Sequence, residues 1–167
     1  TSIGTEAFDN KGLQSVVIPE TITSIGDWAF YSNQLTSIDI PDSVTEIGIE
    51  AFAYNNLTEA TIGDSVKTIY EEAFIGNDLR SVYIGDSVTR IDHWAFRSND
   101  RSNPNLESIS ISEDAPYGIR SGFPYWIEFV ERKASKKVKA TDSKSDNNAV
   151  IDIITGTSKN NKLKGKK

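Results

Sequence analysis

One short string recurs up to residue 96 at a fixed spacing and limits what this chain can fold into. It begins with isoleucine and ends with Ala-Phe, and four copies occupy 25–30, 47–52, 69–74 and 91–96. Their starting points are separated by a constant interval of 22, and a fifth copy lies one interval upstream at 3–8. A fixed period in the twenties is typical of a solenoid, in which each unit buries its apolar face against its neighbours. The repeat therefore predicts an elongated stack of similar coils.

Each unit contains a second segment with the alternation expected of a half-buried strand. In 35–40, Leu-Thr-Ser-Ile-Asp-Ile, the isoleucines alternate with polar residues. Equivalent segments are 13–18, 57–62, 79–84 and 106–111. Pro19 and Pro41, replaced by Gly63 and Gly85, then end the strand, because proline cannot donate to a ladder and glycine tolerates a sharp turn. The Ala-Phe pair that follows is expected on a single helical turn.

Stacking the units places equivalent residues in columns about 4.8 Å apart, the spacing of neighbouring strands. The phenylalanines should form an aromatic column (Phe8, Phe30, Phe52, Phe74 and Phe96), and the alanines before them should be small because another wall passes close by. A column of asparagines (Asn33, Asn55, Asn77 and Asn99) should satisfy turn carbonyls and N–H groups of adjacent units. These columns predict the scaffold of the molecule.

The repeated string I-P-x-x-V-x-x-I-G-x-x-A-F resembles the BspA-like class of leucine-rich repeats from bacterial surface proteins. The resemblance covers residues 1 to about 130. It implies a right-handed α/β-type repeat solenoid of about five 22-residue repeats. A parallel sheet would line its concave side, with short helical or 3-10 turns opposite. Such solenoids bind macromolecules, so the resemblance implies a binding module.

Changes in the pattern along the chain predict four segments. The solenoid should span 1–111, with an insertion at 100–104, and the aromatic-rich segment 112–130 should cap the open end of its core. Residues 131–148 have the polar, lysine-rich composition of a linker. Residues 149–167 contain one short apolar run. They then weakly resemble the start of hemolysin-type calcium-binding repeats, with Lys159 and Asn161 where glycine and aspartate are usual. We expect calcium only in repeats beyond this segment, and no cofactor here.

The charge is divided unevenly. Residues 131–167 hold 11 basic and 4 acidic residues, a net +7, so residues 1–130 carry −13 of the total −6. The basic tail lacks interleaved aromatics and the acidic body would repel phosphate, which disfavours nucleic acid. No stretch is apolar enough to insert into a membrane. Methionine is absent even at position 1, so we expect a monomeric piece of a longer protein whose targeting signal lies elsewhere.

Residues for catalysis are scarce. The chain has no cysteine and a single histidine, His93, which falls in a variable position expected to be solvated. No nucleophile-elbow or phosphate-loop motif is present, and one histidine without cysteine makes a zinc site implausible. We predict a protein that is not an enzyme.

An acidic column follows the predicted strands, at Glu20, Asp42, Asp64 and Asp86. Aspartate after proline or glycine can cap the turn that follows it by accepting from its N–H groups. A row of carboxylates can also hold divalent cations or steer a basic partner. The structural interpretation is favoured.

The exposed face of the predicted sheet supplies the candidate binding residues: Asp39, Glu59, Thr61, Arg80 and Tyr83, with Asp100 and Arg101 in the inserted loop. Tyr83 near Arg80 is a combination enriched at binding hot spots. The rest of the face is mostly serine and threonine, which also suits a plain solvated sheet. We expect a binding or adhesion module of a secreted or cell-surface bacterial protein, with a protein or glycan partner. The alternative is a rod that spaces other domains.

Overall fold

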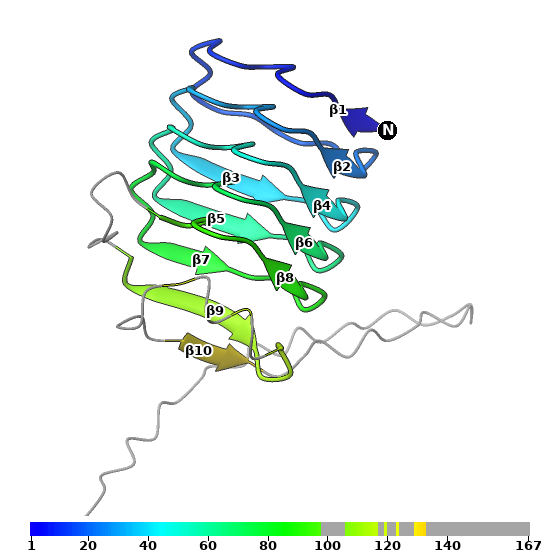
Figure 1. The fold of residues 1–167 in the computed structure, drawn as a ribbon, viewed down its shortest axis with the longest axis vertical. Coiled ribbons are helices and arrows are strands. Elements are labelled where there is room, and N and C mark those ends of the chain that lie inside the picture. Colours follow the sequence, from blue (N-terminus) through cyan, green and yellow to red (C-terminus); the bar gives the residue numbers. More distant parts are fainter. Residues whose placement is uncertain (98–105, 117–118, 120–122, 124–128, 133–167) are drawn as a thin grey trace, which may run out of the picture. The chain divides into compact units, whose positions relative to one another are not determined.

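The strands of this chain lie in two parallel sheets that run along a stack of coils (Figure 1). The computed structural model describes residues 1–97, 106–116, 119, 123 and 129–132. Sheet A contains β1 (Ser2–Ile3), β2 (Ser24–Ile25), β4 (Glu46–Ile47), β6 (Thr68–Ile69) and β8 (Arg90–Ile91). Sheet B contains β3 (Ser37–Ile40), β5 (Glu59–Ile62), β7 (Ser81–Tyr83), β9 (Ser108–Ser112) and β10 (Phe129–Arg132). These strands belong to a compact unit, Thr1–Lys136.

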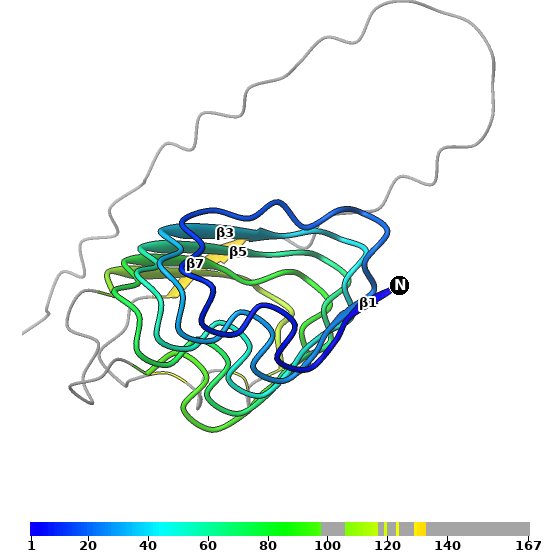
Figure 2. The ribbon, with the colours of Figure 1, turned by 90° about the horizontal axis from the view of Figure 1, so that it is seen from above.

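We call the units 1–22, 23–44, 45–66 and 67–88 coils 1 to 4, and coil 5 begins at residue 89. Coils 2 to 5 each contribute one strand to each sheet, coil 1 contributes only β1 to sheet A, and the pairing follows the sequence period. Ser2 pairs with Ser24 in sheet A, and Ser37 pairs with Glu59 in sheet B, in each case with the residue one period further along the chain. Viewed from above, the coils superimpose, with β3, β5 and β7 along one side and β1 on another (Figure 2). The predicted solenoid is confirmed, and sheet A is a feature that the sequence analysis did not foresee.

The insertion in coil 5 is confirmed by the register of sheet B. Ser81 of β7 pairs with Ser108 of β9, and this step along the sequence exceeds the regular period by the length of the predicted insertion. The inserted residues, with Asp100 and Arg101, lie outside the described part of the chain. The strand ladder nevertheless continues across the insertion without a shift of face.

The core is a stack of identical side chains. In β3 and β5 the residues alternate between exposed and buried, so the side chains of Ile38, Ile40 and Ile62 point inward. The predicted phenylalanine column is confirmed: neighbouring rings from Phe8 to Phe96 are stacked with centroids 5.1–5.3 Å apart. Stacked rings at this separation add attraction beyond the area that they bury. The core therefore continues from coil to coil without a break.

The asparagine column is confirmed as a ladder between coils at Asn33, Asn55 and Asn77, whereas Asn99 lies outside the described part of the chain. The Asn55 side-chain oxygen accepts from the Leu35 N–H at 3.1 Å, and its amide donates to the Phe30 carbonyl at 2.9 Å and the Phe52 carbonyl at 3.1 Å. Asn33 and Asn77 make the equivalent bonds. All three side chains are buried. An amide suits this position because it can donate and accept at once.

The Ala-Phe segments form a third wall of turns, and the predicted helical turn is wrong. Within the described residues there is no α-helix. The Ala29 N–H bonds the Gly26 carbonyl within the same coil, but the Trp28 and Phe30 N–H groups donate to carbonyls of the next coil, at Ile49 and Ala51. The residue before each Ala-Phe pair has a positive φ, 54° at Trp28, and a second follows at Ser32, 53°. A helix cannot continue through left-handed residues, and here the bonds between coils replace those within a helix.

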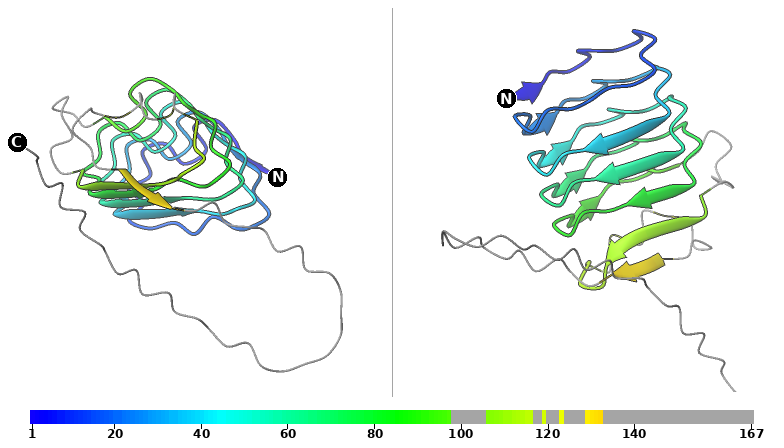
Figure 3. Two further views of the ribbon diagram at one scale, coloured as in Figure 1. Left: turned by 90° about the horizontal axis from the view of Figure 1, so that it is seen from below. Right: turned by 180° about the vertical axis from the view of Figure 1, so that it is seen from behind.

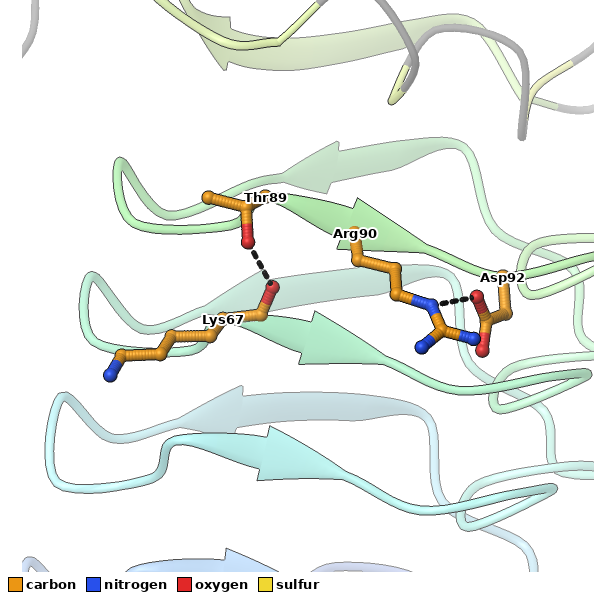
Figure 4. A network of polar contacts seen from close by, with 4 residues as sticks. All are labelled: Lys67, Thr89, Arg90 and Asp92. Atoms are coloured by element: carbon orange, nitrogen blue, oxygen red, sulfur yellow. Dashed lines mark hydrogen bonds and ion pairs between the residues drawn. The ribbon is translucent and has the colours of Figure 1, made fainter.

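A column of threonines adds side-chain bonds between coils beside sheet A. The Thr89 hydroxyl donates to the Lys67 carbonyl at 3.3 Å, and Thr45 does the same to Thr23 at 3.1 Å (Figure 4). In the same view Arg90 pairs with Asp92 of its own coil at 2.5 Å. That ion pair is solvent-exposed on its arginine side, so we expect little stability from it.

The two ends of the solenoid differ from the prediction in detail. The segment 13–18 of coil 1 forms no strand, although the sequence pattern predicts one, and Val17 in this segment is 90% exposed. At the other end, the Phe123 ring stacks on Phe96 at 5.0 Å and Ile119 is buried, as expected of a cap. β10 continues sheet B beside β9 (Figure 3), so it extends to Arg132, within the segment predicted as a linker. Residues 133–148 and 149–167 lie outside the described part.

Candidate functional site

A hollow of about 380 Å³ lies over the carboxyl ends of β3, β5 and β7. Three of the residues that line it are Asp39, Thr61 and Tyr83, which pair directly across sheet B. Their side chains face outward because the buried residues occupy the alternate positions of the same strands. Three of the five predicted sheet residues are therefore brought together in one site.

The acidic column forms the other wall of the hollow. Glu20, Asp42 and Asp64 line it beside the strand ends. The sequence predicts the acidic column and the column of Asp39, Thr61 and Tyr83 separately, without placing them in one site. The signal was present: the acidic residue follows the outward-facing strand residue by three positions in each coil, as in Asp39 and Asp42. Because both columns run along the same edge of a parallel sheet, their side chains lie next to each other.

The floor of the hollow is backbone. A Cβ placed on Gly63 would lie 2.6 Å from the Ile40 carbonyl oxygen and from the Pro41 carbonyl, and one on Gly85 would lie 2.2 Å from the Gly63 oxygen. These glycines therefore allow consecutive coils to approach closely; the sharp turn that the sequence suggested is a lesser reason. Gly63 also lines the hollow.

The acidic column is structural, but not in the predicted way. The Asp42 carboxylate accepts from the Asp64 N–H at 2.7 Å, and Asp64 accepts from the Asp86 N–H at 3.3 Å. Each carboxylate thus links its coil to the next one, whereas the sequence predicted a cap on its own turn. One oxygen of Asp42 is engaged in this bond, and the side chain remains exposed. The row can therefore join the coils and still present negative charge to the hollow.

Two predicted sheet residues lie apart from the hollow. Glu59 belongs to the neighbouring outward column, where it pairs with Ser37 and Ser81. Arg80 is exposed just before β7 and does not line the hollow with Tyr83. The predicted pairing of Arg80 with Tyr83 therefore does not define this site.

The donor set of the hollow suits recognition of polar groups. Carboxylates accept hydrogen bonds, and the Thr61 and Tyr83 hydroxyls can donate or accept. Among the described residues, no cluster of three acidic or histidine side chains is arranged to hold a metal ion. His93 is exposed on the turn wall, with its ring 4.2 Å from that of Trp94, and has no place in this site.

A comparison with protein families decides what kind of solenoid this is. The model described as the BspA type leucine-rich repeat region matches residues 1–103, in six copies. The chain belongs to the BspA-type leucine-rich repeat family. BspA-type repeats are modules typical of bacterial surface or adhesion proteins, and the family is generally non-enzymatic. No curated protein matches the chain. In the part of the BspA-type chain that the structure describes, no helix is both long and apolar enough to cross a membrane.

Proposed function

We propose that this BspA-type solenoid is a non-enzymatic binding module that holds a protein or glycan partner in the hollow on sheet B. The observation that carries the proposal is the convergence of Asp39, Thr61 and Tyr83 from three adjacent strands beside the acidic column. Binding sites combine an aromatic anchor with a few placed polar groups in a concavity, and this hollow contains both. The proposed setting is a secreted or cell-surface bacterial protein.

The geometry supports contact with an extended partner. The strands that supply the site are held in register by the ladder, the phenylalanine column and the asparagine column. Little backbone movement is needed to present the site, so binding should cost little ordering entropy. Tyr83 is half-buried, which fixes its ring while leaving a surface for contact.

A panel of glycans and of purified extracellular-matrix proteins, each immobilised, provides the test. If the proposal holds, at least one member binds the full chain, and Tyr83→Ala weakens it by about tenfold or more, the loss of one hot-spot side chain. Tyr70→Ala is the matched control, since Tyr70 is likewise a half-buried tyrosine and lies directly after β6 of sheet A. Equal effects of the two substitutions on every bound member would sink the proposal.

The second candidate function is a spacer. It is favoured by the outward column of sheet B that contains Ser37, Ser81 and Ser108, because these small side chains provide little contact surface for a partner. A spacer would tolerate Tyr83→Ala and Asp39→Asn together without change in any interaction. Removal of a whole coil would instead alter its function, because the length would change.

A further inference from the structure

The turn wall carries a second hollow whose residues recur elsewhere in the chain. It measures about 270 Å³ and is lined by Glu6 and Asp9 from coil 1 and by Trp28 and Tyr31 from coil 2. The same pattern recurs three periods later: Glu6 corresponds to Glu72, Trp28 to Trp94 and Tyr31 to Arg97. The chain therefore contains two versions of one arrangement, and they can be compared directly.

In the arrangement around Trp94, a cation of the chain itself lies over the tryptophan ring. The Arg97 guanidinium lies over the Trp94 ring, 4.6 Å from its centroid, a cation–π contact. Burial raises the pKa of Glu72, Glu50 and Glu71 raise it further, and Arg97 acts in the opposite direction. The guanidinium therefore lies within the electrostatic reach of Glu72 as well as over the ring. An aromatic face and a carboxylate from the preceding coil together hold the positive charge.

In the earlier version the cation is missing and the negative charge is greater. Tyr31 stands at the position that supplies the guanidinium in coil 5, and Asp9 stands where the later copy has Ile75. Within the residues that the structure describes, no arginine or lysine lies over the Trp28 ring. Lys11, a cation in the same coil as Glu6, does not line the hollow.

The backbone indicates that tryptophan is not in this column for the sake of the core. Trp28 and Trp94 have left-handed φ values of 54° and 59°, which are unfavourable for large side chains. Glutamate occupies the same column at three other coils, so the turn does not require an aromatic residue. Trp94 is 42% exposed, and its ring contacts two surface groups, the Arg97 guanidinium and the His93 ring. By the same reasoning, a cation supplied from outside the chain would account for the presence of Trp28.

Tyr31 adds a second aromatic wall. Its ring packs edge-on against Tyr54, with centroids 5.4 Å apart, which holds it in place. Burial raises the pKa of the Tyr31 phenol, and Glu50, Tyr54 and Asp9 raise it further, so the hydroxyl stays neutral and protonated. The hollow thus has two aromatic walls and two carboxylates, the set of groups that suits a guanidinium.

We propose that the Glu6–Asp9–Trp28–Tyr31 hollow is a binding site for an arginine side chain of a partner protein. The partner supplies from outside the cation that Arg97 supplies from within the chain at the equivalent position. This site lies on the turn wall, is lined by none of the residues of the sheet B hollow, and goes beyond the function proposed for that hollow.

The test uses the full chain and a blocked peptide, acetyl-Gly-Gly-Arg-Gly-Gly-amide, with the citrulline peptide as its neutral isostere. The readout is the indole N–H resonance of Trp28, identified by its loss in Trp28→Phe. The arginine peptide should shift this resonance saturably, with a dissociation constant of about a millimolar for a single side chain, and leave that of Trp94 unmoved. Equal shifts by the citrulline peptide, or no shift with arginine, would overturn the proposal.

Three substitutions sharpen the result. Tyr31→Arg supplies the internal cation of coil 5 and should abolish peptide binding, while Glu6→Gln, at an exposed side chain, should weaken it by about tenfold. Arg97→Ala uncovers Trp94, so its resonance should become sensitive to the peptide. As a control, Tyr83→Ala should leave the Trp28 response unchanged, which separates this site from the sheet B hollow. Retained binding in Tyr31→Arg, with the fold intact by circular dichroism, would contradict the proposal.

Discussion

At the scale of single residues, coils 2 to 4 each depend on one buried asparagine. The Asn55 side chain makes bonds to backbone groups of two coils, with Leu35, Phe30 and Phe52 as partners. A buried backbone group that loses its partner costs about 1–3 kcal/mol. Truncating Asn55 leaves the Leu35 N–H without a partner, whereas the Phe30 and Phe52 carbonyls keep the bonds that Asn33 and Asn77 donate to them.

We expect Asn55→Ala to lower the free energy of unfolding by about 1–3 kcal/mol, mainly through the buried Leu35 N–H that it leaves unpaired. The neighbouring Asn56 is exposed, so Asn56→Ala should change stability by less than about 0.5 kcal/mol. Urea unfolding followed by circular dichroism measures both. Similar losses for the two variants would mean that the ladder is not what holds the coils.

Residue identity predicted some of these roles and missed others, for a physical reason. An amide with both donors and acceptors has one obvious use in a repeated turn, so the asparagine ladder was predictable. A carboxylate such as Asp42 can accept from its own turn or from the next coil, and composition does not distinguish the two. The sharing of one hollow by Asp39 and Asp42 also depends on the path of the backbone at Gly63, which is known only once the chain is folded.

At the scale of elements, the strand ladder was predictable and the turn wall was not. Period-2 alternation at 37–40 and 59–62 reports directly which side chains are buried. The turn wall instead depends on left-handed residues such as Glu50 and Tyr54, whose side chains carry no preference for that conformation. Its hydrogen bonds run to the adjacent coil, so no local sequence pattern predicts them.

Close packing between elements gives a prediction with an internal control. A Cβ on Gly48 would lie 2.6 Å from the Asp27 backbone nitrogen, whereas a Cβ on Gly4, in the same column, would meet nothing within 4 Å. Gly48→Ala should therefore destabilise the chain by about 1–3 kcal/mol, the cost of overpacking. Gly4→Ala should be neutral or slightly stabilising, since it restricts the unfolded chain. Thermal melting of the two variants measures the difference, and a stable Gly48→Ala would show that the coils can separate at no cost.

At the scale of the whole solenoid, stability should be a sum over coils and their contacts. Each coil bonds the coils before and after it through both sheets and the asparagine ladder. In such arrays each unit interacts with its nearest neighbours, so a unit can be removed without loss of the fold.

Deleting residues 47–68, one period, should give a folded chain with one coil fewer and a lower melting temperature, because Glu46 then precedes Ile69 as it now precedes Ile47. The four residues that line the hollow with Glu6 and Trp28 remain in this variant, but Tyr31 loses the ring of Tyr54 against which it packs. Deleting 47–67 falls one position short of a period and leaves an extra residue inside the fused strand of sheet A, which shifts side chains of that strand to the wrong face, so this variant should be markedly less stable than the first. Far-ultraviolet circular dichroism and gel filtration distinguish the two outcomes, and equal behaviour would contradict the fixed period.

The uniform interface between coils also affects how the gene can evolve. The surface that one coil offers to the next is nearly the same at every step, so a gene that gains or loses one period by unequal recombination creates no new kind of junction. Each duplicate begins as a working copy whose exposed positions are free to diverge. Glu6, Trp28 and Tyr31 beside Glu72, Trp94 and Arg97 show how small that divergence needs to be: two exchanges, of tyrosine for arginine and of aspartate for isoleucine, separate the two arrangements.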